Sequence, residues 1–202
     1  MSARIRMALV VAALLALAAA AGVTVFARTG GGGADAGAGG FAGGIRPAVP
    51  PQDFRLRDQD GDAVSLRGYR GRVVVLTFLY TTCRDTCPLT ATQIRGALDD
   101  LDADVPALAV SVDPANDTPE RARRFLFNRG LDRGRMRFLL GSRSELRPVW
   151  EAYGIRPQGD GFDHSAYVLL VDRRGRQRVG FPVAQLTPEA LAHDIRRLQA
   201  EA

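Results

Sequence analysis

Residues 73–90 read VVVLTFLYTTCRDTCPLT, and this stretch decides the fold. Residues 73–80 are almost continuously apolar and rich in β-branched and aromatic side chains, which is typical of a central strand covered on both faces. Pro88 suits the first turn of a helix, and apolar residues then recur at helical spacing over residues 94–101. The sequence therefore predicts a buried strand, a loop with two cysteines and a helix, in that order.

Strand and helix patterns alternate around this stretch. Apolar and polar residues alternate over residues 54–66 on both sides of a turn at 58–61, which predicts an N-terminal hairpin. Further strands are expected at residues 107–113, 136–140, 165–172 and 177–181. Three further helices are expected to begin after residues that suit an N-cap, namely Thr118, Ser142 and Thr187. This order predicts an α/β sandwich around a mixed central sheet.

Length and charge limit the classes of function. A chain of 202 residues with 46% hydrophobic content can bury one full core. The net charge is +5, but four of the 27 basic residues and one of the 22 acidic residues precede residue 49, which leaves 23 arginines against 21 acids. No arginine cluster with interleaved aromatic residues follows, so nucleic acid is not an expected partner. Arg121, Arg123 and Arg124 are interpreted as a solvated helix face.

The first 48 residues differ in composition from the rest. Residues 1–28 contain the apolar run 7–27 and are interpreted as an uncleaved membrane anchor, with a cleaved signal peptide as the alternative. Arg4 and Arg6 before this run favour a cytoplasmic N-terminus and a folded domain on the extracytoplasmic side of the cell membrane. Residues 29–48 are rich in glycine and predict a flexible linker, followed by a folded domain at 49–202.

Cys83 and Cys87, the two cysteines, allow three interpretations. A structural disulfide would close a very short loop and stabilise the fold little. A redox couple is possible, although the thioredoxin spacing is Cys-x-x-Cys and here three residues intervene. Two thiolates also suit Cu(I) or zinc but need a third ligand. The candidates are His164 in a loop, His193 on the last helix, where a surface role is expected, and Met136, which is expected in the core.

Five segments in order carry a resemblance to a known family. They are DFRLRDQDGDAVSLRGYRGRVVVLTFLYTTCRDTCP (53–88), SVDPANDTPE (111–120), the helix at 142–153, DHSAYVLLVDRRGR (163–176) and TPEALAHDIRRL (187–198). Together they resemble the Sco/SenC family of copper-binding, thioredoxin-like proteins that serve cytochrome c oxidase assembly. The resemblance covers nearly all of the chain from residue 51 onward, and the apolar leader agrees with the family's usual transmembrane anchor.

The resemblance implies a thioredoxin-like fold with the loop before residue 165 lying against the cysteine loop. Carried over residue by residue, Cys83, Cys87 and His164 become the ligands of a copper ion, as Cu(I) or Cu(II). Asp113 matches an acidic position that would support the site indirectly. Arg84 stands where the family usually has proline, which brings a positive charge close to the thiols.

The implied function is that of a membrane-tethered copper metallochaperone, without catalytic turnover, that delivers copper to the binuclear centre of cytochrome c oxidase. Its partners would be the copper-bearing oxidase subunit and a thiol reductant or another copper chaperone. The alternative is an enzyme, a thiol-disulfide oxidoreductase in which Cys83 and Cys87 are redox-active toward an oxidase subunit or a similar target. The residues alone do not decide between these functions.

Overall fold

The computed structural model describes residues 40–46, 51–101, 104–156 and 167–201. The strands in this part of the chain are β1 (Gly44–Ile45), β2 (Arg55–Arg57), β3 (Ala63–Ser65), β4 (Val74–Leu79), β5 (Ala107–Ser111), β6 (Met136–Leu139), β7 (Tyr167–Val171) and β8 (Gln177–Pro182). The helices are η1 (Leu66–Tyr69), α2 (Thr86–Asp99), α3 (Pro119–Asn128), α4 (Arg143–Tyr153), η2 (Val183–Gln185) and α5 (Pro188–Ala200).

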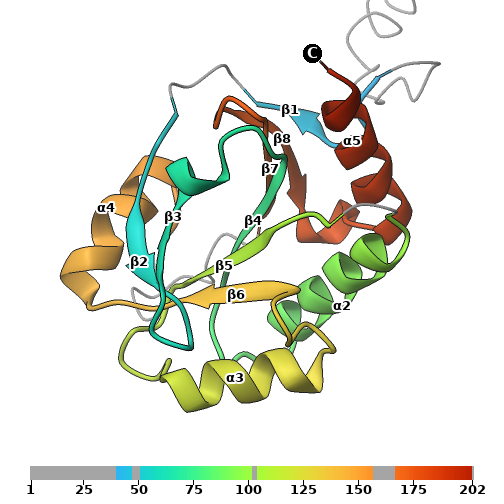
Figure 1. The fold of residues 1–202 in the computed structure, drawn as a ribbon. Helices are drawn as coiled ribbons and strands as arrows, with labels where there is room; N and C mark the ends of the chain where they lie inside the picture. Colours follow the sequence, from blue (N-terminus) through green and yellow to red (C-terminus); the bar gives the residue numbers. More distant parts are fainter. Residues whose placement is uncertain (1–39, 47–50, 102–103, 157–166, 202) are drawn as a thin grey trace, which may run out of the picture. The chain divides into compact units, whose positions relative to one another are not determined.

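The central sheet is mixed and has the order β1-β8-β7-β4-β5-β6 (Figure 1). Strand β4 lies in the middle, parallel to β5 and antiparallel to β7, and β5 is parallel to β6. Thr77 of β4 is opposite Val168 of β7, so β7 begins at the edge of the sheet where β4 ends. The cysteine loop follows β4 at this edge. The α/β sandwich with a mixed sheet that the sequence predicts is confirmed.

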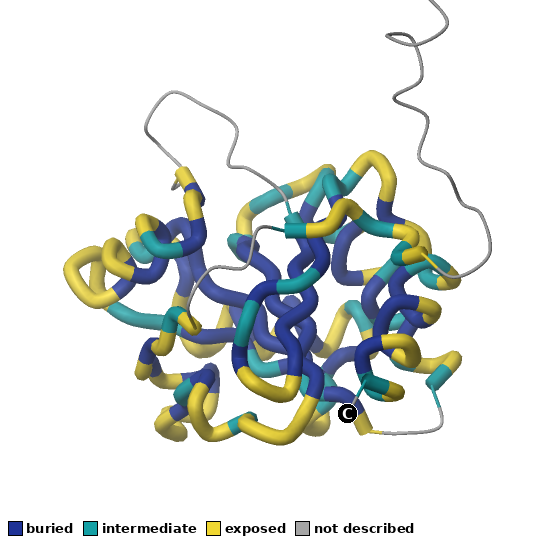
Figure 2. Tube along the Cα trace, turned by 90° about the horizontal axis from the view of Figure 1, so that it is seen from above, coloured by how far each residue is buried: buried dark blue, intermediate teal, exposed yellow. Residues whose placement is uncertain are grey.

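Two apolar layers cover the sheet, and residues of β4 alternate between them. Val75 and Leu79 pack with apolar residues of α2, α3 and α5, whereas Leu76 and Phe78 pack with those of α4 and the β2–β3 hairpin. Every residue of β4 is buried, as expected for a strand covered on both faces. Figure 2 shows the buried residues gathered along the strands and the exposed ones on the turns and outer helix faces. Met136 is 1% exposed and belongs to the core, as predicted.

The helix starts follow the chemistry of their first residues. The hydroxyl of Thr118 accepts a hydrogen bond from the Arg121 amide, and that of Thr187 accepts one from the Ala190 amide. Ser142 and Glu145 form the reciprocal capping box at the start of α4. Each predicted N-cap is therefore confirmed.

The folded unit begins earlier than the predicted boundary at residue 49. Gly44 and Ile45 pair with β8, and the compact unit extends from Phe41 to the C-terminus. The buried carboxylate of Asp194 accepts hydrogen bonds from the amides of Ala42 (2.8 Å) and Gly43 (2.9 Å) and holds this segment in place. The last part of the predicted linker thus belongs to the domain.

The predicted membrane anchor, residues 1–28, lies outside the described residues. Within the ranges that are described, every helix is too short or too polar to cross a membrane.

Candidate functional site

Cys83 and Cys87 lie where β4 ends and α2 begins. Cys83 is half-buried in the loop, and Cys87 is fully buried in the first turn of α2. They are not joined in a disulfide, and the Cys87 amide donates a hydrogen bond to Cys83 Sγ over 3.2 Å. The helix start therefore supplies a backbone donor to the more accessible sulfur.

The pKa values of the two cysteines are shifted in opposite directions. A hydrogen bond from the Cys87 side chain, opposed by burial and assisted by the backbone amides of Cys87 and Asp85, lowers the pKa of Cys83 to about 5 from its ordinary 9.0. The same contact with Cys83, together with burial, raises the pKa of Cys87 above its usual range. At neutral pH the pair therefore holds an accessible thiolate on Cys83 and a proton on Cys87.

A buried carboxylate fixes the start of the cysteine loop. Asp117 Oδ1 accepts hydrogen bonds from the amide and the hydroxyl of Thr81, both at 2.7 Å. Its Oδ2 accepts one from the hydroxyl of Ser111 at the end of β5, at 2.5 Å. Burial raises the pKa of Asp117, and the hydrogen bonds from Ser111 and Thr81 oppose that increase. Asp117 thus ties the loop to the neighbouring strand.

The family resemblance pointed to Asp113 as an acid that would support the site indirectly. Asp113 accepts a hydrogen bond from the Asn116 side chain at 2.9 Å within its own loop. The acid that bonds to the cysteine loop is Asp117, which sequence reasoning missed. Its signal was an acid immediately before the N-cap Thr118, but the residue that it holds, Thr81, is distant in sequence.

The other candidate ligands have different outcomes. His164 lies outside the described residues. His193 lies on α5, where Nδ1 is 2.8 Å from Asp194 Oδ1 and the side chain is 56% exposed, as expected for a surface residue. Within the described ranges, which omit residues 157–166, no group of three or more His, Cys, Asp or Glu side chains is arranged to hold a metal ion. The described residues therefore supply two soft donors, Cys83 and Cys87.

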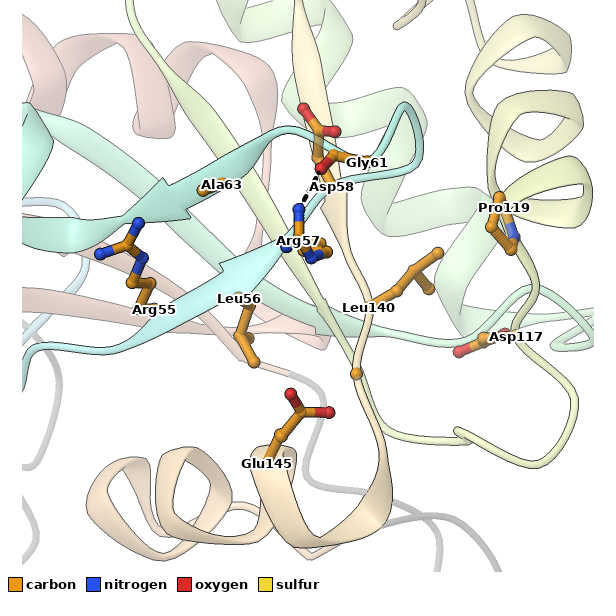
Figure 3. Close-up of a pocket in the computed structure, with 11 residues that line it drawn as sticks. Arg55, Leu56, Arg57, Asp58, Gly61, Ala63, Asp117, Pro119, Leu140 and Glu145 are labelled. Atoms are coloured by element: carbon orange, nitrogen blue, oxygen red, sulfur yellow. Dashed lines mark hydrogen bonds between the residues drawn. The ribbon is translucent and has the colours of Figure 1, made fainter.

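A hollow of about 540 Å³ borders Asp117 and lies between the β2–β3 hairpin, the end of β6 and the start of α4 (Figure 3). Its lining includes Arg55, Arg57 and Glu145, with Asp117 and Pro119 at one border. Neither cysteine lines it. The hollow contains neither of the two soft donors, so the cysteine loop is the candidate site.

Comparison with known proteins identifies relatives of this chain. The SCO1/SenC family model matches residues 46–200. The SCO1 protein homolog of Bacillus subtilis (strain 168) is 32% identical over 146 residues, which cover 68% of this chain and 76% of that protein.

Two solved structures share the fold. Bradyrhizobium japonicum ScoI with copper bound has a TM-score of 0.60 and 32% identity, covering 74% of this chain and 99% of that one. BsSco, described as a member of the Sco family of cytochrome c oxidase assembly proteins with a disulfide switch, has a TM-score of 0.66 and 27% identity over 78% of this chain and 99% of its own. These matches confirm the thioredoxin-like α/β fold that the resemblance implied.

Proposed function

Because this chain belongs to the SCO1/SenC family, we propose that it binds copper through Cys83, Cys87 and His164 and delivers it to the binuclear copper centre of cytochrome c oxidase. Copper is then the cargo of a metallochaperone. The copper-bound relative and the oxidase-assembly relative support this proposal.

The observation that carries the proposal is the pair of sulfur donors. Cys83 and Cys87 are four residues apart, and the Cys87 amide bonds to Cys83 Sγ at 3.2 Å, so both sulfurs belong to one turn of backbone. Thiolates are soft ligands that favour Cu(I). Cys83 is already ionised at neutral pH, because its pKa is lowered to about 5, and only Cys87 must lose a proton on binding.

The sheet register supports His164 as the third ligand. Thr77 Oγ1 donates a hydrogen bond to the carbonyl of Tyr167, which opens β7 beside the end of β4. His164 precedes Tyr167 by three residues, and three residues of chain reach at most about 11 Å. The topology thus allows an imidazole from the loop before β7 to meet the two sulfurs at the same edge of the sheet. Two thiolates and an imidazole suit trigonal Cu(I), and Cu(II) would take a further donor.

Oxidation would switch this site off. A Cys83–Cys87 disulfide forms when the two thiols lose two electrons and two protons to an oxidant such as another disulfide, and neither sulfur is then a thiolate donor. The disulfide switch described for BsSco supports this relation between redox state and metal loading. We propose that a thiol reductant returns two electrons and two protons to the disulfide, and that another copper chaperone can then supply copper to the reduced site.

The location completes the proposal. Residues 1–28 would anchor the chain in the cell membrane, and the glycine-rich segment that follows would let the domain reach the copper-bearing oxidase subunit on the extracytoplasmic side. Delivery by ligand exchange suits a site that has few ligands and one half-buried sulfur.

Anaerobic titration of the reduced protein with Cu(I), in competition with a chromogenic chelator, tests the ligand set. His164→Ala should weaken binding at least about tenfold, because a three-ligand site loses one donor. His193→Ala is the matched control, since that imidazole contacts Asp194 on α5, and it should bind like the unchanged protein. Equal Cu(I) affinity in His164→Ala and His193→Ala would contradict the ligand assignment. If the unchanged protein catalysed disulfide exchange but did not bind Cu(I), the alternative function, a thiol-disulfide oxidoreductase, would be indicated.

A further inference from the structure

A second pocket, of about 370 Å³, opens directly beside Cys83. The cysteine loop forms one wall through Thr81, Thr82 and Cys83. The opposite wall comes from one face of α3 and its end, and its charged members are Arg121, Arg124 and Arg129. Among the described residues that line it, none is acidic. A molecule in this pocket would therefore touch the accessible sulfur and meet a positive field.

These three arginines differ in their pairing from Arg123, which lies between them in the sequence. In the described ranges, Arg123 on the same helix pairs with Asp60 and Glu120, whereas none of Arg121, Arg124 and Arg129 forms an ion pair. Arg121 donates a hydrogen bond to the carbonyl of Asn116 at 2.9 Å, which fixes its position without neutralising its charge.

Arg129 adds an independent sign of a missing ligand. Its guanidinium lies 5.9 Å from the centre of the Phe125 ring, and its Nε is buried without a hydrogen-bond partner among the described residues. A buried donor without an acceptor is costly, and a bound acceptor would remove that cost.

A large apolar side chain is also exposed on α3, the helix that forms one wall of the pocket. Phe127 on this helix is 69% exposed. Phe127 follows Arg124 by three residues, so the two side chains are neighbours on the helix surface. Exposed apolar residues beside unpaired charges are typical of a protein interface rather than of a site for a small inorganic anion.

We propose that this arginine pocket, defined by Arg121, Arg124 and Arg129, docks an acidic segment of a protein partner, with its carboxylates on the guanidinium groups and an apolar residue against Phe127. The segment would bring the partner's metal-binding or thiol group next to Cys83. This inference rests on the proposed function for the nature of the exchange, and on the described residues alone for the charge of the partner.

Paired alkylating reagents test the field at Cys83 without copper. Iodoacetate and iodoacetamide both form a bond from the Cys83 thiolate to carbon and displace iodide, and they differ in charge. Peptide mass spectrometry locates the modification at Cys83, and the quantity measured is the rate with iodoacetate divided by the rate with iodoacetamide. This ratio should fall by about two- to threefold in Arg121→Gln, and by a similar factor in Arg124→Gln, as expected for a unit charge roughly 6–10 Å away in water. Arg123→Gln is the control on the opposite face and should leave the ratio unchanged.

Salt provides the same test without a variant, because about 0.5 M NaCl should lower the ratio in the unchanged protein by screening. A ratio that neither the two substitutions nor salt changes would overturn the proposal. The Cu(I) titration stays a separate test, because the arginines donate no metal ligand, and Arg124→Gln should bind Cu(I) normally.

A peptide identifies the occupant. The acetylated, amidated peptide ELEELE should slow iodoacetamide alkylation of Cys83 at least about threefold at millimolar concentration and low salt, and QLQQLQ should not. Arg121→Gln/Arg124→Gln should abolish this protection. Equal protection by citrate would identify a small-anion pocket and overturn the docking surface, as would no protection by ELEELE.

Discussion

Arginines on the two sides of α3 face two different loops, and in the described part of the chain they are paired with an acid at one loop and unpaired at the other. On one side, Arg123 reaches the hairpin turn at residues 58–61, where it donates to the Gln59 carbonyl and pairs with Asp60. On the other side, Arg121 and Arg124 line the pocket at the cysteine loop and pair with no acid among the described residues. Paired charges are expected where a loop stabilises the fold, and unpaired charges where a loop binds a partner.

The hairpin turn shows how complete the pairing can be. Asp58 is 3% exposed and accepts hydrogen bonds from the amides of Asp60 and Asp62 and from Arg137 at 2.6 Å. Gly61 supplies the turn's positive φ of 89°. The side-chain oxygen of Gln59 accepts a hydrogen bond from the Phe138 amide, and the backbone carbonyl of Arg57 accepts one from the Leu140 amide. These bonds satisfy backbone donors at the outer edge of β6.

The largest effect is therefore expected at the hairpin. Asp58→Ala should lower the free energy of unfolding by about 3 kcal/mol, because two amides and a guanidinium lose a buried acceptor. Asp62→Ala is the control, since that side chain is 72% exposed and 3.8 Å from Arg137, and it should have little effect. Urea denaturation measures both. Equal losses for the two variants would show that Asp58 does not organise the turn.

The second effect concerns the thiol pair. Alkylation of Cys83 by iodoacetamide needs the thiolate, so in the metal-free protein its rate should fall as the pH drops through about 5. Cys87→Ala removes the main hydrogen bond to Cys83, and the midpoint should move toward 9.0, the ordinary value. Cys87→Ser keeps a donor and should move it less. A midpoint near 9 in the unchanged protein would contradict the coupling.

The third effect separates the two acids after β5. Asp117→Ala should weaken Cu(I) binding about tenfold, because Thr81 and the start of the cysteine loop lose their anchor. Asp113→Ala should change the affinity little, since its carboxylate bonds to Asn116 within its own loop. Both acids are 8% exposed, which makes the pair a matched comparison in the same chelator competition. The reverse order of effects would restore Asp113 as the supporting residue.

The sequence predicted regular elements well because their signals are local. The continuous apolar run of β4 and the capping residues Thr118 and Ser142 act over a few positions, and the structure confirms them. Strand β1 was missed because the glycine-rich segment that contains it indicated a linker. At Gly43 a Cβ would come within 2.5 Å of Val179, so at least this glycine allows close packing.

The site was less predictable because its contacts join distant segments. Asp117 bonds to Thr81 and Ser111, and no spacing along the chain relates it to the cysteine loop. Arg121, Arg123 and Arg124 were interpreted together as a solvated face, and their different surroundings depend on how α3 packs. The assignment of His164 stays a prediction.

The smallest effect tests the comparison on α3 itself. Arg123→Gln should lower the free energy of unfolding by about 1 kcal/mol, because the side chain loses its hydrogen bond to the Gln59 carbonyl and its pairing with Asp60. Arg124→Gln should change it by less than about 0.5 kcal/mol, since it removes an exposed charge with no ion pair among the described residues. Urea denaturation of the two variants would contradict the division if Arg124→Gln were the more destabilised, because Arg124 would then support the fold and its charge would not be available to a partner.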